Sequence, residues 1–402
     1  MIARILALSL AASSTLVATD WPQRRGPSHN GISAETAWKA AFSADGPKQL
    51  WKASVGTGFS GVVIADGRAF TMGSGTGDKD FVVALDAGTG KELWRITYAE
   101  PLNPKMYEGG PNSTPTVDGG SVYTASKSGK VHCLDAATGG IKWTVDLQQA
   151  AGITKSDWGV SGAPLVVGEK LILNFGNGPT VLAKDSGKKI WSAGGGENNS
   201  FNTPVVTKVR GEEVVLAHQK KELIGFRLSD GKRLFGHKFG KGYETHCSDP
   251  VLTSAGVFIS SGDDGGELLD LSSGQPKRVW KNMNLSTFTC TAVAIGDVLY
   301  GHDSAGYKRA NQEFRCVDIK TGAVKWSLGG FGQGSVIAAG DRLIVLSDNG
   351  ELAILKATPE KPEVIARTQA LGGKTWTQPA LANGKLYLRN AKGDVVCVDL
   401  NG

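Results

Sequence analysis

One phrase recurs along this chain and limits its fold more than any other feature. Three strong copies share an Asp, a Thr-Gly pair and a closing Trp: VVALDAGTGKELWRI (82–96), VHCLDAATGGIKWTV (131–145) and FRCVDIKTGAVKWSL (314–328). Weaker copies close at Trp191, Phe235, Trp280 and Ile365. The closing residues recur with a period in the middle forties, and each unit contains short strand-like runs between glycine turns. This pattern predicts a β-propeller in which each unit is one blade of four strands.

The two ends of the chain fix the number of blades. The last copy stops at VVCVDLNG (395–402) without a closing strand, while an orphan closing strand, QLWKAS (49–54), stands near the start. We therefore expect residues 49–54 to complete the last blade, which leaves no unpaired edge at the junction. The expected fold is an all-β, eight-bladed propeller of four-stranded antiparallel blades over residues 49–402. An N-terminal extension, residues 19–48, precedes it, and its packing is not predicted.

Within the repeat, each residue type has a structural role that its chemistry explains. The Asp carboxylate can accept backbone N–H groups in a tight turn, and the Gly supplies left-handed backbone there. The closing Trp should pack flat between neighbouring blades, each burial contributing on the order of 2–3 kcal/mol. The residues expected in these roles are Trp51, Asp86, Gly90, Trp94, Asp135, Gly139, Trp143, Trp191, Trp280, Asp318, Gly322 and Trp326. On this interpretation the repeated phrase is architecture and binds no ligand by itself.

Charge and the first residues indicate where the protein works. The formal charge is +6 over 402 residues with no basic run, which gives little support for a nucleic-acid partner. Residues 1–18 combine one Arg, an apolar stretch and small residues, the pattern of a secretory signal peptide. No later apolar run approaches the roughly 20 residues of a membrane span. The first cysteine, Cys133, lies too far along to carry a bacterial lipid anchor. We expect an exported monomer, periplasmic or secreted.

The repeat resembles that of the pyrroloquinoline-quinone (PQQ)-like propeller family. The pattern A-x-D-x-x-T-G-x-x-x-W is seen as ALDAGTGKELW and, with a cysteine first, as CLDAATGGIKW, and the resemblance covers residues 49–402. The opening WPQRRGPSHNGIS (21–33) is similar to the leader of secreted bacterial members. The same repeat occurs in quinoprotein alcohol dehydrogenases and in the non-catalytic outer membrane protein assembly factor BamB. The resemblance therefore implies the propeller fold and two functions of different classes.

The residues favour the non-catalytic function. Quinoprotein dehydrogenases commonly place a disulfide between two adjacent cysteines against PQQ and hold calcium with acidic and amide side chains. No two of the five cysteines here are adjacent, and there is no C-x-x-C-H haem motif. The leading hypothesis is an exported, non-catalytic scaffold, without a cofactor, for a protein or polysaccharide partner of the cell envelope. The alternative is an oxidoreductase that uses PQQ with calcium on an alcohol or sugar. A hydrolase has no motif in its support.

Candidate binding residues lie in the loops that lead into the innermost strand of each blade. In a propeller these loops form one face around the channel, where ligands usually bind. Carboxylates, amides and aromatic rings there suit a calcium ion, a sugar or a flat ring. The candidates are Glu108, Asn112, Asp157, Trp158, Asn199, His246, Gln333, Trp376 and Gln378. The alternative is that these groups satisfy the loop backbone and water in the channel.

The cysteines have mainly structural interpretations. Three occupy an equivalent strand position two residues before the Asp and are expected in the core: Cys133, Cys316 and Cys397. The pair His246-Cys247 lacks the second pair that a zinc site needs, so we expect a structural role. Cys247 and Cys290 enter consecutive blades at similar places, so a disulfide between them stays an open alternative.

Overall fold

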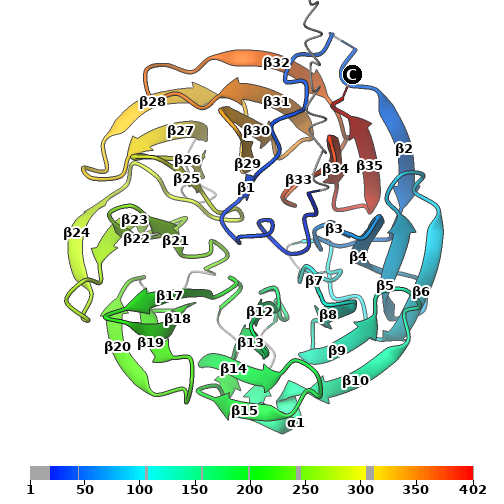
Figure 1. Ribbon diagram of the computed structural model, residues 1–402, viewed down its shortest axis with the longest axis vertical. Helices are drawn as coiled ribbons and strands as arrows, with labels where there is room; N and C mark the ends of the chain where they lie inside the picture. The colour runs from blue at the N-terminus through cyan, green and yellow to red at the C-terminus, as the bar shows by residue number, and fades with distance from the viewer. Residues whose placement is uncertain are drawn as a thin grey trace, which may run out of the picture.

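The protein is a ring of eight β-sheets around a central channel (Figure 1). The computed structural model describes residues 19–43, 45–104, 107–154, 157–197, 200–240, 246–304 and 312–401. Each sheet has four antiparallel strands, and one of them carries a fifth, short parallel strand. The eight-bladed propeller predicted from the repeat is thus confirmed. The expected signal peptide, residues 1–18, lies outside the described residues.

In blades 1 to 7 the strands follow the chain from the innermost to the outermost. Blade 1 comprises β3 (Val63–Ala65), β4 (Arg68–Ser74), β5 (Lys79–Asp86) and β6 (Glu92–Ala99). Blade 2 comprises β7 (Thr116–Asp118), β8 (Ser121–Ala125), β9 (Lys130–Asp135) and β10 (Ile141–Asp146). Blade 3 comprises β12 (Leu165–Val167), β13 (Lys170–Phe175), β14 (Gly178–Ala183) and β15 (Lys189–Ser192). Blade 4 comprises β17 (Val205–Val209), β18 (Glu212–Gln219), β19 (Glu222–Arg227) and β20 (Arg233–Lys238).

The second half of the ring repeats this order until the last blade. Blade 5 comprises β21 (Val251–Thr253), β22 (Gly256–Ser261), β23 (Gly265–Asp270) and β24 (Lys277–Asn282). Blade 6 comprises β25 (Val293–Ile295), β26 (Val298–Asp303), β27 (Glu313–Asp318) and β28 (Val324–Gly329). Blade 7 comprises β29 (Ser335–Ala339), β30 (Arg342–Leu346), β31 (Glu351–Lys356) and β32 (Val364–Gln369). Blade 8 comprises β33 (Ala380–Ala382), β34 (Lys385–Arg389), β35 (Asp394–Asp399) and β2 (Gln49–Ser54).

The repeated phrase joins neighbouring blades wherever its closing residue is a Trp. The Nε1–H of Trp94, on the outer strand of blade 1, donates to the carbonyl of Ala136 in the turn of blade 2 at 3.0 Å. In that turn Asp135 accepts the backbone N–H of Thr138 at 3.0 Å. Gly139 has a φ of +75°, and a Cβ there would lie 2.7 Å from the Trp94 ring. The same donation to the next blade recurs at Trp51, Trp143, Trp191, Trp280 and Trp326.

The ring is closed by strand pairing between the two ends of the propeller. β2 pairs antiparallel with β35, and Trp51 stands opposite Cys397. Trp51 is 7% exposed, and its Nε1–H donates to the carbonyl of Ala87 in blade 1 at 3.0 Å. Closure therefore rests on backbone hydrogen bonds between distant parts of the chain, on the buried Trp51 indole and on two side chains of β34. Tyr387 donates to the carbonyl of Ala87 at 3.0 Å, and the buried Arg389 donates to the carbonyl of Met72 in blade 1 at 2.6 Å.

Blade 7 has lost the marks of the repeat, and the expected closing residue was wrong by one. Ala366 stands opposite Ile354, where Trp94 stands opposite Ala84 in blade 1. Ala366 is buried, whereas Ile365 is only partly buried. The register was misjudged because this copy has neither the Gly nor the Trp that sets the position in other blades.

Three short elements lie outside the repeat. Helix α1 (Leu147–Ala151) follows blade 2, although the sequence shows no helical period. It forms because Asp146 accepts the N–H of Gln148 at 2.9 Å and Gly152, with a φ of +65°, ends it. β11 (Ile153–Thr154) and β16 (Gly196–Glu197) form a parallel pair. β1 (Ile32–Ser33) is the fifth strand of the blade 7 sheet.

The N-terminal segment, residues 19–43, runs over one face of the ring and across the mouth of the channel (Figure 1). Trp21 is 2% exposed and belongs to the core cluster that also includes residues of blades 1, 7 and 8. In the part of the chain that the structure describes, no helix has the length and apolar character of a membrane span.

Candidate functional site

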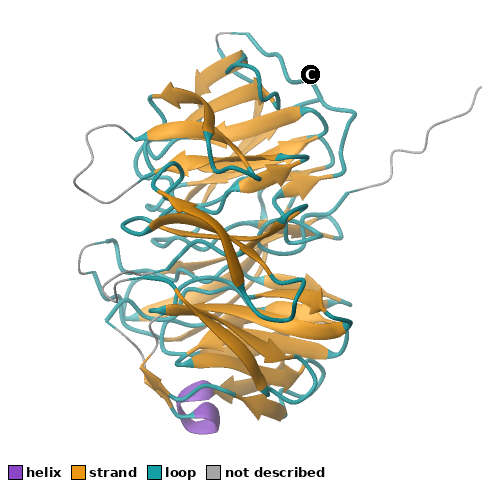
Figure 2. Ribbon diagram, turned by 90° about the vertical axis from the view of Figure 1, so that its left-hand side faces the viewer, coloured by secondary structure: helices purple, strands orange, loops and turns teal. Residues whose placement is uncertain are grey.

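The strands of each blade run between the two faces of the ring (Figure 2). Because successive strands alternate in direction, the loops into the innermost strands all lie on one face, which we call the loop face. The turns that follow the innermost strands lie on the opposite face together with the Asp-Thr-Gly turns. We call this the turn face. The N-terminal segment lies on the turn face, where Glu35 accepts the N–H of Gly384 at 2.7 Å.

On the loop face, four aromatic side chains from four neighbouring blades form a continuous row. It comprises Trp376, Phe59, Tyr107 and Trp158, from the loops into blades 8, 1, 2 and 3. Consecutive ring centroids lie 5.3 Å, 6.2 Å and 5.6 Å apart, within the range of aromatic packing. All four residues are partly exposed. We call this set the aromatic row.

One end of the aromatic row carries an ion pair. The Lys374 ammonium lies 4.6 Å from the ring centroid of Trp376 and 5.9 Å from that of Phe59. The same ammonium pairs with the Glu108 carboxylate at 3.1 Å. Lys374 therefore neutralises Glu108 and adds a cation–π contact to the row.

The other end of the row is fixed by hydrogen bonds. The Tyr107 hydroxyl donates to the carbonyl of Trp158 at 3.0 Å and accepts from the Asn112 amide at 3.4 Å. Asp157 is exposed, and its carbonyl accepts from the Asn103 amide at 3.1 Å. Four of the predicted site residues therefore lie together on the loop face: Glu108, Asn112, Trp158 and Trp376. They are connected by contacts with three residues that were not predicted: Phe59, Tyr107 and Lys374. The sequence alone does not single out the row, because the loops into the other four blades also contain an aromatic residue, among them Phe201, Phe288 and Phe331.

The remaining candidates take part in other contacts. The Gln378 amide donates to the carbonyl of Val336 at 2.9 Å. Gln333 is 5% exposed, and its side-chain oxygen has no hydrogen-bond partner among the described residues. Asn199 lies outside the described residues.

His246 belongs to a buried histidine pair. Its ring stacks on that of His218 with centroids 3.9 Å apart, and both residues are fully buried. The Nε2–H of His246 donates to the carbonyl of Lys220 at 3.0 Å. Burial lowers the pKa of His246 to about 4, so the ring is neutral at pH 7. A neutral, stacked and enclosed ring acts as a packing group.

The N-terminal segment brings a charged cluster into the channel that the candidate set above does not contain. Arg24 pairs through Nε with the Asp249 carboxylate at 3.0 Å, and the Asp249 side chain is fully buried. His29 Nε2 lies 3.9 Å from the same carboxylate, while its Nδ1–H donates to the Arg24 carbonyl at 2.9 Å. Arg25 donates to the carbonyls of Ala292 and Asn30, both at 3.0 Å. These contacts fix the segment to the loops into blades 5 and 6.

Burial and charge set the protonation states of this cluster. Burial alone would raise the pKa of Asp249, but Arg24, His29 and Arg25 outweigh it and hold the pKa below its ordinary value. Burial lowers the pKa of His29 to about 4 and that of Arg25 to about 10. At pH 7 the cluster therefore holds two cations, one anion and a neutral imidazole.

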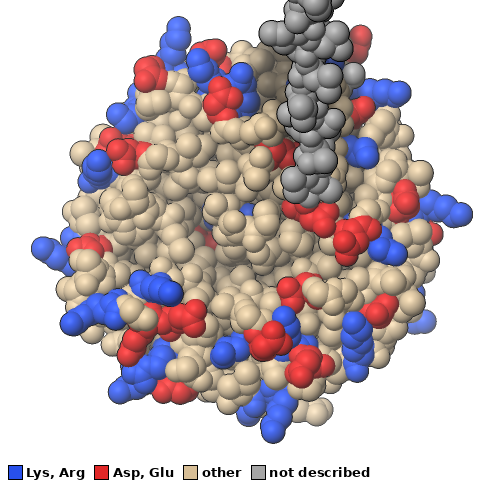
Figure 3. Space-filling view, viewed as in Figure 1, with Lys and Arg blue, Asp and Glu red and all other residues tan. Residues whose placement is uncertain are grey.

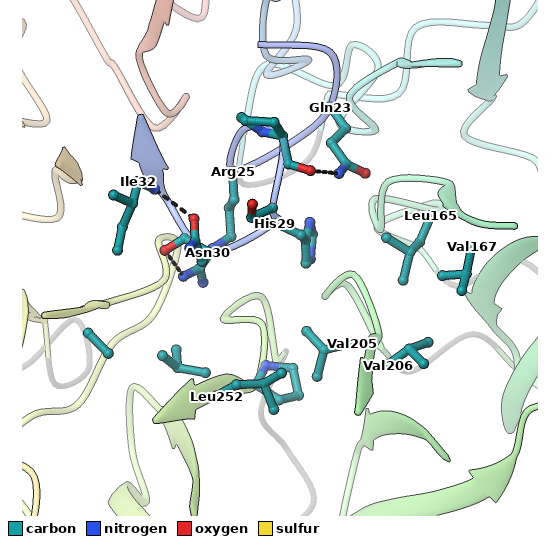
Figure 4. A pocket seen from close by; sticks show the side chains of 15 residues that line it. Gln23, Arg25, His29, Asn30, Ile32, Leu165, Val167, Val205, Val206 and Leu252 are labelled. Atoms are coloured by element: carbon teal, nitrogen blue, oxygen red, sulfur yellow. Dashed lines mark hydrogen bonds between the residues drawn. The ribbon is translucent and has the colours of Figure 1, made fainter. Parts of the chain in front are cut away.

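A cavity of about 300 Å³ lies beside the N-terminal segment within the channel (Figure 4). One wall is the segment itself, and the other is formed by residues on or next to the innermost strands of blades 3 to 6. We call this cavity between the two walls the channel cavity. The turn face is hollowed at its centre, and its charged side chains lie mainly around the rim (Figure 3). Sequence reasoning expected ligands on the loop face and did not predict it.

The described residues do not fit PQQ with calcium. Calcium needs several oxygen ligands, but Glu108 is already paired with Lys374. Among the described residues no group of three or more His, Cys, Asp or Glu side chains is placed to hold a metal. The Trp376 ring already packs against Phe59 and Lys374. Cys247 and Cys290 are not joined by a disulfide.

Comparison with known proteins gives one family and one fold. The sequence model of the family described as outer membrane protein assembly factor BamB matches residues 37–109 and 78–328. BamB of Shewanella oneidensis is 22% identical over 336 residues, which cover 80% of this chain and 78% of that protein. In keeping with the expectation that leaned against an enzyme, this relative is named as an assembly factor.

Solved structures show the same fold at lower identity. BamB from Moraxella catarrhalis has a TM-score of 0.64 and 18% identity, covering 88% of this chain and 97% of that one. Quinohemoprotein alcohol dehydrogenase from Comamonas testosteroni has a TM-score of 0.71 and 14% identity, covering 95% of this chain and 81% of that one. At such identities the likeness concerns the propeller and not its chemistry.

Proposed function

Because this chain belongs to the family of the outer membrane protein assembly factor BamB, we propose that it is an exported, non-catalytic scaffold that binds a protein partner in outer membrane protein assembly. The observation that carries this proposal is the extent of the family match, which runs over more than half of the chain. The rigid ring supports it, since its faces and rim can hold partners in fixed positions.

The proposal includes export of the chain. The composition of residues 1–18 supports a signal peptide, and an assembly factor for outer membrane proteins works outside the cytoplasm. Mass spectrometry of the protein purified from its host should find an N-terminus near residue 19. An intact Met1 would contradict export by this route.

A deletion in the host tests the assembly function. Loss of the gene should lower the amount of folded outer membrane β-barrels, measured by their heat-modifiable migration on gels, and the full-length gene should restore it. A matched strain that expresses the Trp143→Ala variant is the control for misfolding of the protein itself, because Trp143 lies at a blade junction and its loss affects folding. Unchanged β-barrel levels in the deletion strain would overturn the proposal.

The alternative, an oxidoreductase dependent on PQQ and calcium, is tested separately. Calorimetric titration of the purified protein with PQQ and calcium, followed by a dye-linked oxidation assay with alcohols and sugars, should show neither saturable heat nor turnover. Binding with turnover would replace the scaffold proposal and direct mutagenesis to Glu108 and Trp376.

A further inference from the structure

The N-terminal segment shows how an extended chain binds inside this channel. Trp21 exchanges two backbone hydrogen bonds with Ile64 of β3, both 2.9 Å long. The carbonyl of Pro22 accepts the N–H of Val117 of β7 at 2.8 Å. β1 adds to β29 as a parallel strand. An extended segment of the chain therefore occupies the inner edges of blades 1, 2 and 7, by the strand addition through which sheets commonly bind peptides.

The inner edges of blades 3 to 6 have no such partner strand among the described residues. Their innermost strands, β12, β17, β21 and β25, each pair with one neighbouring strand only. A free strand edge presents unpaired N–H and C=O groups that readily accept another chain. These four strands and the residues next to them form the wall of the channel cavity opposite the N-terminal segment.

The wall of the channel cavity is apolar. It is lined by aliphatic side chains that include Leu165, Val167, Val206, Leu252 and Ala294 (Figure 4). Leu252 is 44% exposed, which is high for a leucine inside a channel. The cavity of about 300 Å³ corresponds to the liquid volume of about ten waters. An aliphatic occupant would remove this surface from water.

The charged groups beside the cavity favour an uncharged occupant. Arg25 lines the cavity, but it is only 2% exposed, so an occupant cannot contact its guanidinium directly. Its Nη2 donates to Ala292 and Asn30, while Nε and Nη1 have no hydrogen-bond partner among the described residues. Burial lowers the pKa of His29 to about 4, which leaves a neutral ring at pH 7. Asp249 is fully buried and paired with Arg24. A charged segment would lose its hydration here without gaining an accessible counter-charge.

We propose that the channel cavity receives an extended, uncharged, aliphatic segment of a partner polypeptide, which adds as a strand to the inner edge of one of blades 3 to 6. The inference rests on the proposed function, since it gives the scaffold a site for its protein partner. The aliphatic side chains of the partner fill the recess beside Leu252 and Val206. Its backbone bonds the free strand edge, as β1 bonds β29.

Peptide binding to the full chain tests this inference. A fluorescein-labelled peptide, Thr-Val-Thr-Val-Thr-Val-Thr with blocked ends, is titrated with protein and followed by fluorescence polarisation. A matched peptide has proline at its central position, which removes one N–H and disfavours a paired strand. We expect saturable binding of the first peptide and at least tenfold weaker binding of the second.

Two substitutions in the cavity and one on the rim locate the site. Leu252→Glu and Val206→Glu should each weaken peptide binding at least tenfold. Val279→Glu is the matched control, because Val279 lies on the outer strand β24 and is 49% exposed. It should leave binding unchanged. The inference is overturned if the peptide does not bind, if the proline peptide binds equally well, or if variants of comparable melting temperature bind like the parent.

A host experiment separates this inference from the proposed function. If the deletion lowers folded β-barrels and Leu252→Glu restores them fully, the cavity is not the partner site while the scaffold function stands. If the deletion has no effect, the scaffold function fails and the peptide titration alone decides what the cavity binds.

Discussion

Replacing Trp51 with alanine should loosen the closure of the ring, because Trp51 stands on β2, an outer strand that is distant in sequence from the rest of blade 8. Its indole lies between two blades. The ring centroid is 5.9 Å from that of Tyr387 in blade 8, and Nε1–H donates to Ala87 of blade 1 at 3.0 Å. Truncation removes both contacts and leaves the turn around Gly90 without its cover.

The size of the effect follows from the buried area and the hydrogen bond. A buried Trp covers about 150–250 Å², which at about 25 cal/mol per Å² gives about 4–6 kcal/mol as an upper bound. Measured truncations of this kind cost about 3–5 kcal/mol. At about 2.1 cal/mol/K per residue, a ring of roughly 380 residues has an unfolding entropy of about 0.8 kcal/mol/K. A loss of about 4 kcal/mol should then lower Tm by about 5 °C.

Differential scanning calorimetry at a fixed scan rate measures this shift, and hydrogen exchange shows where it arises. In Trp51→Ala, amides of β2 and β35 should exchange faster than elsewhere. Trp326→Ala is the matched control, since Trp326 donates to Thr358 at 2.8 Å but stands in a blade formed by one continuous stretch of chain. It should lower Tm similarly without faster exchange in β2. A Tm within 1 °C of the parent, or equal exchange of β2 in both variants, would refute the closure argument.

Three further predictions concern the turn, the histidines and the channel cluster. Gly139→Ala should lower the free energy of unfolding by about 1–3 kcal/mol, because the added Cβ meets the Trp94 ring. Gly119→Ala is the control in the same thermal melts, since Gly119 also has a positive φ but has open space around it, so it shows the effect of backbone strain without the clash. Stability, measured in urea titrations, should fall as pH drops from about 6.5 towards 4. Four buried histidines have a folded pKa of about 4, so the unfolded chain binds more protons in that window: His29, His132, His246 and His302. Each contributes up to about 3 kcal/mol to the change, and a flat pH profile would contradict their burial. Asp249→Asn should expose the N-terminal segment to trypsin, with faster cleavage after Arg24 on gels, whereas Asp394→Asn, on a partly exposed ion pair, should not.

The sequence by itself determined the ring. The closing residue of a copy contacts the neighbouring blade, as Trp94 does with Ala136 and Gly139, so the period shows that each unit is a blade and how neighbouring blades pack. The orphan strand with Trp51 fixed the closure for the same reason. The prediction failed by one residue at Ile365, where the marking residues are missing.

Tertiary structure alone decided the aromatic row, the charged cluster of the N-terminal segment and the channel cavity. The aromatic row joins loops of different blades, and nothing in the sequence distinguishes these four loops from the others, which also contain an aromatic residue. Arg24 and Asp249 are 225 residues apart and meet only because the N-terminal segment crosses the channel. Such contacts leave no period in the sequence, since they are made once and by side chains that no repeat constrains. The same crossing covers the inner edges of blades 1, 2 and 7, and among the described residues it pairs with none of the innermost strands of blades 3 to 6, which line the channel cavity.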